Sequence, residues 1–278
     1  MTGTLLVTTD FSANSKGAIR FAIQWAQQTK QRLAFFYCLP YLRPTRWTEA
    51  QFKAYSEGEK QKAEAALDRF VRDVYRTAGI KKPKFKCIVA MKDDVSRAIV
   101  GTAREIEATA ICMGTRGAGK LRKLIGTNSS AMVNKSPLPL FVVPANYRRA
   151  KIKRVVYGSD LEYIGKELKQ VRSIAKRLDA KVTVLHYDYL ADVDVARKKL
   201  EKIAAKYKSQ DVKFHFKKYH IDKSLAFHLL RDIKSAKASL AILYTNRRRG
   251  WFDRLFLSSK SADVAQAAKL PLLIIPRD

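Results

Sequence analysis

Short apolar runs alternate with longer amphipathic stretches along the whole chain. The first run covers residues 5–9 and ends at Asp10, and from residue 14 apolar residues recur at the three-to-four spacing of a helix. The same alternation predicts strands at 32–39, 84–91, 110–113 and 138–143, with helices at 48–78 and after Asp94. Short apolar runs bounded by glycine or polar residues are typical of buried parallel strands. The pattern therefore predicts an α/β fold, a parallel sheet with helices on both faces.

The pattern restarts after a polar, basic connector at residues 146–150. Strands are expected at 152–158, 181–187, 212–219, 240–245 and 270–275, with helical stretches between them. Ser159-Asp160 repeats Thr9-Asp10, and LPLLIIP near the end repeats the earlier LPLFVVP, which indicates an internal duplication. We therefore expect two doubly wound domains, residues 1–148 and 149–278, each with a five-stranded parallel sheet.

A glycine-rich stretch between Ala108 and Ser130 carries the main candidate chemistry. Gly114 and Gly117 follow an apolar run, and Gly126 precedes Thr127-Asn128-Ser129-Ser130, which has the character of a helix start. Glycine lets backbone N–H groups approach a phosphate, and a helix N-terminus adds partial positive charge. Glycine turns also follow many parallel strands for structural reasons alone, so a plain turn stays the alternative. No Gly-Lys-Ser/Thr closes the stretch, so it is not a P-loop.

Other polar and sulfur-containing residues are candidates for catalytic or metal sites. The adjacent acids Asp93 and Asp94 could hold a metal, but their place before a helix favours capping. Cys38, Cys87 and Cys112 lie in apolar runs without metal-type spacing, which predicts small buried hydrophobic residues in a reducing cytoplasm. All four histidines fall in the second half, which excludes a histidine-based site at the glycine-rich stretch.

The chain is strongly basic, with a formal net charge of +30. Residues 1–150 carry 26 Lys and Arg against 11 Asp and Glu, and residues 151–278 carry 29 against 14. This even spread favours a generally basic surface, which attracts polyanions non-specifically, over a dedicated nucleic-acid arm. No apolar run reaches the roughly 18 residues of a membrane helix, and the basic start of a signal peptide is missing. We therefore expect a cytoplasmic protein with no membrane partner.

The motifs together resemble the universal stress protein family, in its tandem two-domain form with an α-hydrolase-like nucleotide-binding fold. The resemblance covers nearly the whole chain and rests on LLVTTDFS, MGTRG, GTNSS and the terminal strand with its trailing proline. Nucleotide-binding members carry Gly-x-x-Gly, a spacer and Gly-Ser/Thr; here the spacer is residues 118–125, one residue shorter than in the family. The resemblance implies ATP as the cofactor, with Mg²⁺ left open, and the following binding residues: Thr8, Asp10, Cys38, Met113, Gly114, Gly117, Gly126, Thr127, Asn128 and Ser129.

The resemblance also implies a role for each part of this set. Asp10 would lie beside the adenosine, with Cys38 and Met113 lining the base and ribose pocket, and the glycines and hydroxyls would hold the ribose and phosphates. Thr8 stands where the family more often has proline, and Tyr37 where it has histidine.

The second half departs from the motif. Asn246, Arg249 and Ser258 stand in place of the three glycines, and bulky side chains there obstruct backbone approach to a phosphate. The run of arginines from 247 to 249 either binds an anion through side chains or faces solvent. Because Asp160 is retained, a base pocket stays open in both halves, but we expect one ATP per chain, bound in the first domain.

The sequence thus predicts a universal stress protein that binds ATP in its N-terminal domain and acts as a nucleotide-responsive regulatory or protective module. Two alternatives stay open: a tandem stress protein that acts through protein contacts without nucleotide, and a nucleic-acid-associated basic protein. No nucleophile–base pair or metal cluster is visible, so we expect at most slow ATP hydrolysis. In the family the terminal strands pair across a dimer, so strands 138–143 and 270–275 are expected to pair within one chain, and a homodimer is left open.

Overall fold

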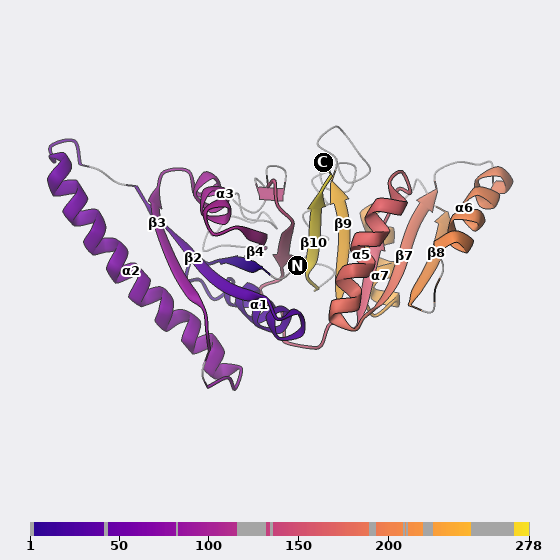
Figure 1. Cartoon of the computed structure of the whole chain (residues 1–278), viewed down its shortest axis with the longest axis horizontal. Helices are drawn as coiled ribbons and strands as arrows, with labels where there is room; N and C mark the ends of the chain where they lie inside the picture. Colours follow the sequence, from indigo (N-terminus) through magenta and orange to yellow (C-terminus); the bar gives the residue numbers. More distant parts are fainter. Residues whose placement is uncertain are drawn as a thin grey trace. The chain divides into compact units, whose positions relative to one another are not determined.

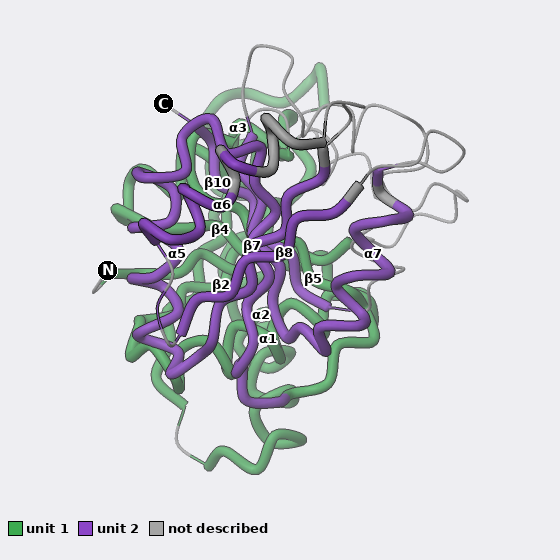
Figure 2. Tube along the Cα trace, turned by 90° about the vertical axis from the view of Figure 1, so that its right-hand side faces the viewer, with its two compact units in different colours: residues 1–149 green, residues 150–278 purple. Residues whose placement is uncertain are grey.

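The computed structural model of the chain describes residues 3–41, 44–81, 83–115, 132–133, 136–188, 193–207, 209, 211–218, 225–245 and 270–277. The chain divides into two compact units, residues 1–149 and 150–278 (Figure 2). Each unit has its own parallel sheet with its own helices, so the α/β class predicted from the sequence is confirmed (Figure 1).

In the described part of unit 1, strand and helix alternate along the chain. The elements are β1 (Thr4–Thr8), α1 (Lys16–Thr29), β2 (Arg32–Pro40), α2 (Glu49–Thr77), β3 (Lys86–Lys92), α3 (Val95–Glu105), β4 (Ala108–Gly114) and β5 (Leu140–Val143). Every described strand pair is parallel, and the order is β3-β2-β1-β4-β5. Helix α1 contacts α2, whereas α3 packs against β2, β3 and β4, so helices cover both faces of the sheet.

Unit 2 repeats this topology. Its elements are β6 (Arg154–Gly158), α5 (Ile164–Leu178), β7 (Lys181–Asp188), α6 (Val193–Tyr207), β8 (Val212–Lys218), α7 (Leu225–Ser235), β9 (Leu240–Thr245) and β10 (Leu272–Pro276). Its described strand pairs are also parallel, in the order β8-β7-β6-β9-β10. Read in chain order, both sheets have the pattern third, second, first, fourth, fifth.

Helix ends follow the sequence signals. Thr48 caps α2 through a capping box in which its side chain accepts from Gln51 N and the Gln51 side chain accepts from Thr48 N. Gly79 follows the end of the same helix with φ +74°, as expected of a C-terminal cap. Asp94 caps α3 by accepting a hydrogen bond from Arg97 N (3.0 Å), so the capping interpretation of this acid is confirmed.

The three cysteines are all free thiols, but they are less uniformly buried than the apolar pattern predicted. Cys112 on β4 is buried, whereas Cys38 on β2 and Cys87 on β3 are only partly buried. The reason is position, since β3 is the edge strand of this sheet and the end of β2 beside it lies at the sheet margin.

An aromatic cluster fixes α1 against β5. The Trp25 and Phe21 rings lie 4.7 and 5.0 Å from the Phe141 ring on β5, between centroids. Arg20 on the same helix donates through Nε to the carbonyl oxygen of Tyr147 at 2.7 Å, which ties the segment after β5 back to α1. These contacts fix α1 relative to β5 and to the segment that follows it.

Candidate functional site

The described candidate residues of unit 1 gather at the carboxyl ends of three neighbouring strands. Thr8 is the last residue of β1, and Asp10 follows two positions later. Cys38 lies near the end of β2, and Met113 and Gly114 end β4. Because β1 pairs with β2 on one side and with β4 on the other, these ends are adjacent.

The space between β1 and β4 is the topological switch point of the sheet. The chain runs outward from β1 to β2 and β3, and then crosses back to β4 on the other side of β1. In doubly wound folds, ligands bind at the carboxyl ends of the strands beside such a switch point. Asp10 and Gly114 flank this point.

The turn after β1 holds the Asp10 carboxylate in place. Its Oδ1 accepts hydrogen bonds from Ser12 N (3.1 Å) and Ser12 Oγ (2.6 Å). The buried hydroxyls of Thr9 and Ser15 lie 2.7 Å apart, and Phe11 N donates to Thr9 Oγ1 at 3.1 Å. Because the loop hydroxyls satisfy one another, the aspartate is pre-positioned at the strand end.

An aromatic wall stands next to this aspartate. The Phe11 ring lies 4.4 Å from the Tyr37 ring and 5.5 Å from the Phe70 ring of α2, between centroids. The pKa of Tyr37 is raised by burial first, and further by the nearby Cys38 and Asp10. Tyr37 is therefore a member of this site, although the sequence marked it only as a departure from the family pattern.

Cys38 lies at the same edge, but its described contacts are with the outer strand. Its Sγ is 3.8 Å from the carbonyl oxygen of Lys92 at the end of β3 and 3.7 Å from that of Leu39. Burial raises the pKa of the Cys38 thiol, so the group stays protonated at neutral pH. It can line a pocket but is not poised as a nucleophile.

The end of β4 pairs with β5, and the contact extends to Thr115. Met113 is 5% exposed, Gly114 pairs with Val143 on β5, and Thr115 N donates to the Val143 carbonyl oxygen at 2.9 Å. The other predicted phosphate-binding residues lie outside the described residues: Gly117, Gly126, Thr127, Asn128 and Ser129. In the described ranges, no three His, Cys, Asp or Glu side chains gather as metal ligands would.

Gly17 allows the start of α1 to touch the end of β5. A Cβ at this position would lie 2.3 Å from the Pro144 carbonyl oxygen and 2.8 Å from that of Ala145. Arg20 Nη2 donates to the Ala145 carbonyl oxygen at 2.8 Å, which ties the same two segments together. In unit 1 the start of α1 and the segment after β5 are thus in direct backbone contact.

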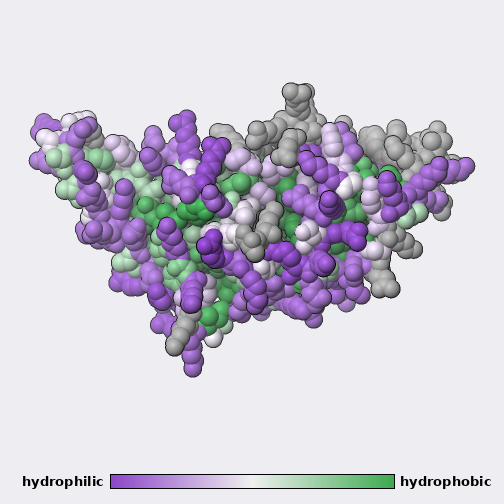
Figure 3. Space-filling view, in the orientation of Figure 1, coloured by the Kyte–Doolittle hydropathy of each residue, from purple (hydrophilic) through white to green (hydrophobic). Residues whose placement is uncertain are grey.

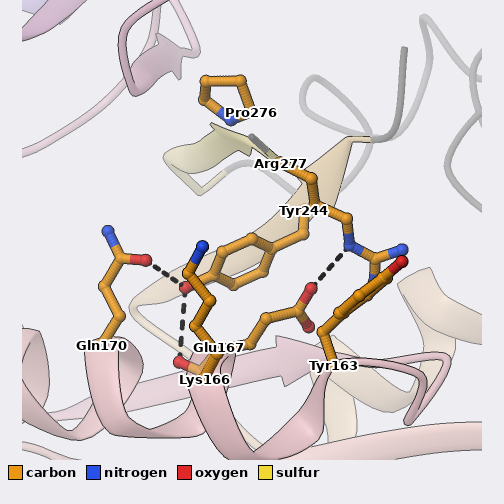
Figure 4. Close-up of a pocket in the computed structure, with 7 residues that line it drawn as sticks. All are labelled: Tyr163, Lys166, Glu167, Gln170, Tyr244, Pro276 and Arg277. Atoms are coloured by element: carbon orange, nitrogen blue, oxygen red, sulfur yellow. Dashed lines mark hydrogen bonds and ion pairs between the residues drawn. The ribbon is translucent and has the colours of Figure 1, made fainter.

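In unit 2 a buried ion pair joins the two equivalent segments, the start of α5 and the residue after β10. Sequence reasoning missed this pair. Asp160 stands where unit 1 has Asp10, Glu167 where it has Gly17, and Arg277 where it has Ala145. Arg277 Nη2 donates to Asp160 Oδ1 at 2.8 Å. Its Nε donates to Glu167 Oε1 at 2.6 Å (Figure 4). The residues after the two trailing prolines differ, Ala-Asn in the first half and Arg-Asp in the second. This difference is the signal that could have revealed the ion pair.

The residues of this ion-pair network are largely buried, and most of their hydrogen bonds are to one another. The side chain of Glu167 is 3% exposed and that of Arg277 is 11% exposed. The Tyr157 hydroxyl donates to Glu167 Oε2 and accepts from Ser159 Oγ. Burial raises the pKa of Glu167, only partly offset by Arg277 and Tyr157; burial lowers the pKa of Arg277, but its bonds to Asp160 and Glu167 outweigh this and raise it.

A small cavity of about 120 Å³ lies beside this network (Figure 4). It is lined by Tyr163, Lys166, Glu167, Gln170, Tyr244, Pro276 and Arg277. The Tyr244 hydroxyl donates to Gln170 Oε1 at 2.8 Å, and the Arg277 guanidinium lies over the Tyr163 ring at 5.0 Å. Asp160 is therefore held by a cation of the same unit.

Comparison with known proteins agrees with this architecture. The family model described as "Universal stress protein family" matches residues 1–144. The whole chain is similar in structure to a universal stress protein from Archaeoglobus fulgidus, with a TM-score of 0.68 at 19% identity over 100% of this chain and 97% of that one. A functionally unknown protein from Pseudomonas aeruginosa gives a TM-score of 0.65 at 14% identity, covering 100% and 93% of the two chains.

A putative universal stress protein from another Pseudomonas aeruginosa strain gives a TM-score of 0.63 at 15% identity, covering 99% of this chain and 93% of that one. At these identities the likeness concerns the fold. A search of curated proteins finds no match to this chain. None of the described helices is both long and apolar enough to cross a membrane.

Proposed function

Because this chain belongs to the universal stress protein family, we propose that its first unit binds ATP at the carboxyl ends of β1 and β4 and thereby controls a regulatory or protective stress response. One observation carries the proposal: Asp10 and Gly114 flank the switch point of the unit 1 sheet. A carboxylate on one side and a glycine on the other suit a ribose hydroxyl and a phosphate respectively.

Each part of the nucleotide has its partner in this proposal. Asp10 accepts hydrogen bonds from the ribose, while Tyr37, Cys38 and Met113 line the pocket for the base. The phosphates bind the backbone N–H groups of the glycine-rich stretch, through residues that lie outside the described ranges: Gly117, Gly126, Thr127, Asn128 and Ser129. A Mg²⁺ ion would enter with the triphosphate as its counter-charge.

Unit 2 is not an ATP site in this proposal. Arg277 occupies the Asp160 carboxylate, and a nucleotide would have to displace it from a buried ion pair. Its loop has Asn246 and Arg249 where the first unit has glycine. The second unit therefore serves as the structural half of a tandem repeat, and the chain binds one ATP.

The two units are proposed to pair through their terminal strands, β5 and β10. Each lies at one edge of its own sheet and consists of apolar residues, so its outer backbone groups need a partner. Cysteines introduced at Val142 and Ile274 should form a cross-link within one chain. Cross-links only between chains would indicate a homodimer instead. The lack of any cross-link would refute the proposed pairing of β5 with β10. The free thiols of Cys38, Cys87 and Cys112 support a cytoplasmic setting.

Isothermal titration calorimetry with ATP on the full chain tests the site. Asp10→Asn should weaken binding roughly 10- to 100-fold, since it removes a charge-assisted hydrogen bond. Asp160→Asn is the matched control in unit 2 and should leave ATP affinity unchanged. Gly117→Val, which adds a β-branched side chain in the glycine-rich stretch, should abolish binding.

Equal ATP affinity in Asp10→Asn and the unmodified chain would refute the role of Asp10. An equal loss in both aspartate variants would refute the asymmetry between the units. Mass spectrometry of nucleotide retained through purification identifies the ligand independently of either variant.

A further inference from the structure

Helix α5 of unit 2 follows α1 of unit 1 in register, 150 residues later. The strands before them, Thr4–Thr8 and Arg154–Gly158, are related by the same offset. So are Phe11 and Leu161, which have φ values of 61° and 67° in the intervening turns. Four positions facing the sheet are buried in both helices: Gly17, Ala18, Phe21 and Trp25 in α1, and Glu167, Leu168, Val171 and Ala175 in α5.

The two helices differ on a second face. In α1 this face is apolar and buried at Ile19, Ala22 and Ile23. The matching residues of α5, Lys169, Arg172 and Ser173, are all exposed. Three positions that are buried and apolar in α1 are therefore polar or charged and exposed to solvent in α5.

The covering helix explains the difference. Unit 1 places the 29-residue α2 against α1, which buries the second face of α1. The corresponding α6 of unit 2 has 15 residues, and the hydroxyl of its Tyr207 lies beside Gly165, in the first turn of α5. The rest of this face is left open in the described structure, and the surface over α5 is largely hydrophilic in Figure 3.

The open face carries four positive side chains in one stripe, which we call the basic face of α5: Lys166, Lys169, Arg172 and Lys176. Spacings of three and four residues put neighbouring side chains about 5–6 Å apart, and the stripe is about 15 Å long. All four are exposed, and no described carboxylate is ion-paired with Lys169, Arg172 or Lys176. The helix's own acid, Glu167, points inward to Arg277.

We propose that the basic face of α5 binds the phosphate backbone of nucleic acid. A linear row of cations is complementary to a polymer that carries closely spaced negative charges, one every 3.4 Å or so along each strand. Like charges held close together on a helix repel one another, so a bound polyanion would stabilise the part of the row formed by Lys169, Arg172 and Lys176. The net charge of +30 makes the whole chain attractive to polyanions, and the basic face gives that attraction a location.

Other anionic partners fit this face less well. Insertion into a membrane needs apolar side chains directed outward, but the apolar side of α5 is buried against its own sheet. Protein interfaces are depleted in lysine and rely on buried aromatic or apolar anchors, which this stripe lacks. Backbone recognition of nucleic acid needs neither, since it is electrostatic and independent of sequence. The inference does not depend on the ATP site, which lies in unit 1.

Fluorescence anisotropy of the full chain with a labelled DNA duplex of about 20 base pairs, titrated over a series of NaCl concentrations, tests the proposal. The variant Lys169→Gln/Arg172→Gln/Lys176→Gln should lower the slope of log K against log salt by about 2.7 and weaken binding on the order of 100-fold near 0.1 M salt. The matched control is Lys53→Gln/Arg69→Gln/Lys86→Gln, which removes the same charge from exposed positions of unit 1. The control should change the slope by less than about one unit.

Equal losses in the two triple variants would overturn the proposal, because binding would then be spread over the whole surface. So would an unchanged slope in the α5 variant whose circular dichroism and thermal unfolding match the parent. Vesicles containing phosphatidylserine supply the same charge in another form. Capture by vesicles that depends on the basic face, with no dependence of DNA binding on it, would assign the face to membranes and overturn the proposal as well.

Discussion

The buried ion pair between Glu167 and Arg277 should dominate the stability of unit 2. In Arg277→Met the packing volume is nearly kept, but Glu167, with 3% of its side chain exposed, loses its cation. Removing one partner of a buried pair costs about 3–5 kcal/mol, because the other charge is left without compensation. Asp160 loses the same partner but is more exposed and is stabilised by water, so Glu167 accounts for most of the cost.

This loss should depend on pH in a defined direction. Burial already raises the pKa of Glu167 above its ordinary value of 4.5, and Arg277 opposes that rise. Without Arg277 the folded-state pKa rises further, so the folded protein holds the proton more tightly than the unfolded chain. The penalty is therefore absent below the unfolded pKa and grows as pH rises through the folded pKa.

Urea unfolding followed by circular dichroism at several pH values measures this loss, and hydrogen exchange of β6 and α5 peptides assigns it to unit 2. The double variant Glu167→Gln/Arg277→Met should recover most of the lost free energy of unfolding, since no buried charge remains. Lys151→Met, which breaks the exposed pair with Asp179, is the control and should change the free energy far less. A loss in Arg277→Met that is no larger than in this control, or that does not vary with pH, would refute the reasoning.

Three further predictions concern unit 1. Gly17→Ala should destabilise the protein by about 1–3 kcal/mol, because its Cβ would lie 2.3 Å from the Pro144 carbonyl oxygen, whereas Gly101→Ala in α3, with nothing within 4 Å, should stabilise it by about 0.5–1 kcal/mol. Asp94→Ala should cost about 1 kcal/mol in urea unfolding by removing the cap of α3, and no change would show that water replaces it. Burial raises the pKa of Cys87 to about 11, so its rate of alkylation by iodoacetamide, followed by mass spectrometry, should still be rising at pH 10; a plateau at pH 9 would contradict this.

The alternation of apolar runs was enough to predict the fold of both halves. Strands of four to nine residues read as apolar runs, and the helix ends follow local signals at Thr48, Gly79 and Asp94. The positions of Asp10 and Gly114 at strand ends were also predictable, because each follows or ends a short apolar run of the sequence. All of these features depend on residues close together in the chain.

The missed features depend on residues far apart in the chain. Glu167 and Arg277 are separated by 110 positions, and nothing local indicates that the penultimate residue returns to the start of α5. The exposure of Lys169 and Arg172 depends on how far α6 extends over α5, which periodicity alone does not give. Comparing the two halves position by position would have revealed both, since each is a difference between equivalent residues.

The pairing of Asp160 with Arg277 can be transferred to unit 1 as a test of the ATP site. Ala145 follows Pro144 as Arg277 follows Pro276, and it is half-exposed, so Ala145→Arg adds a side chain that can reach Asp10. Added positive charge near a nucleotide ordinarily strengthens binding. Here the arginine should occupy the carboxylate that the ribose needs and weaken ATP binding about tenfold or more in calorimetry. Asn146→Arg adds the same charge one position later, on an exposed residue, and should leave affinity unchanged or raise it. If Ala145→Arg also binds ATP as tightly as the unmodified chain, Asp10 does not contact the nucleotide.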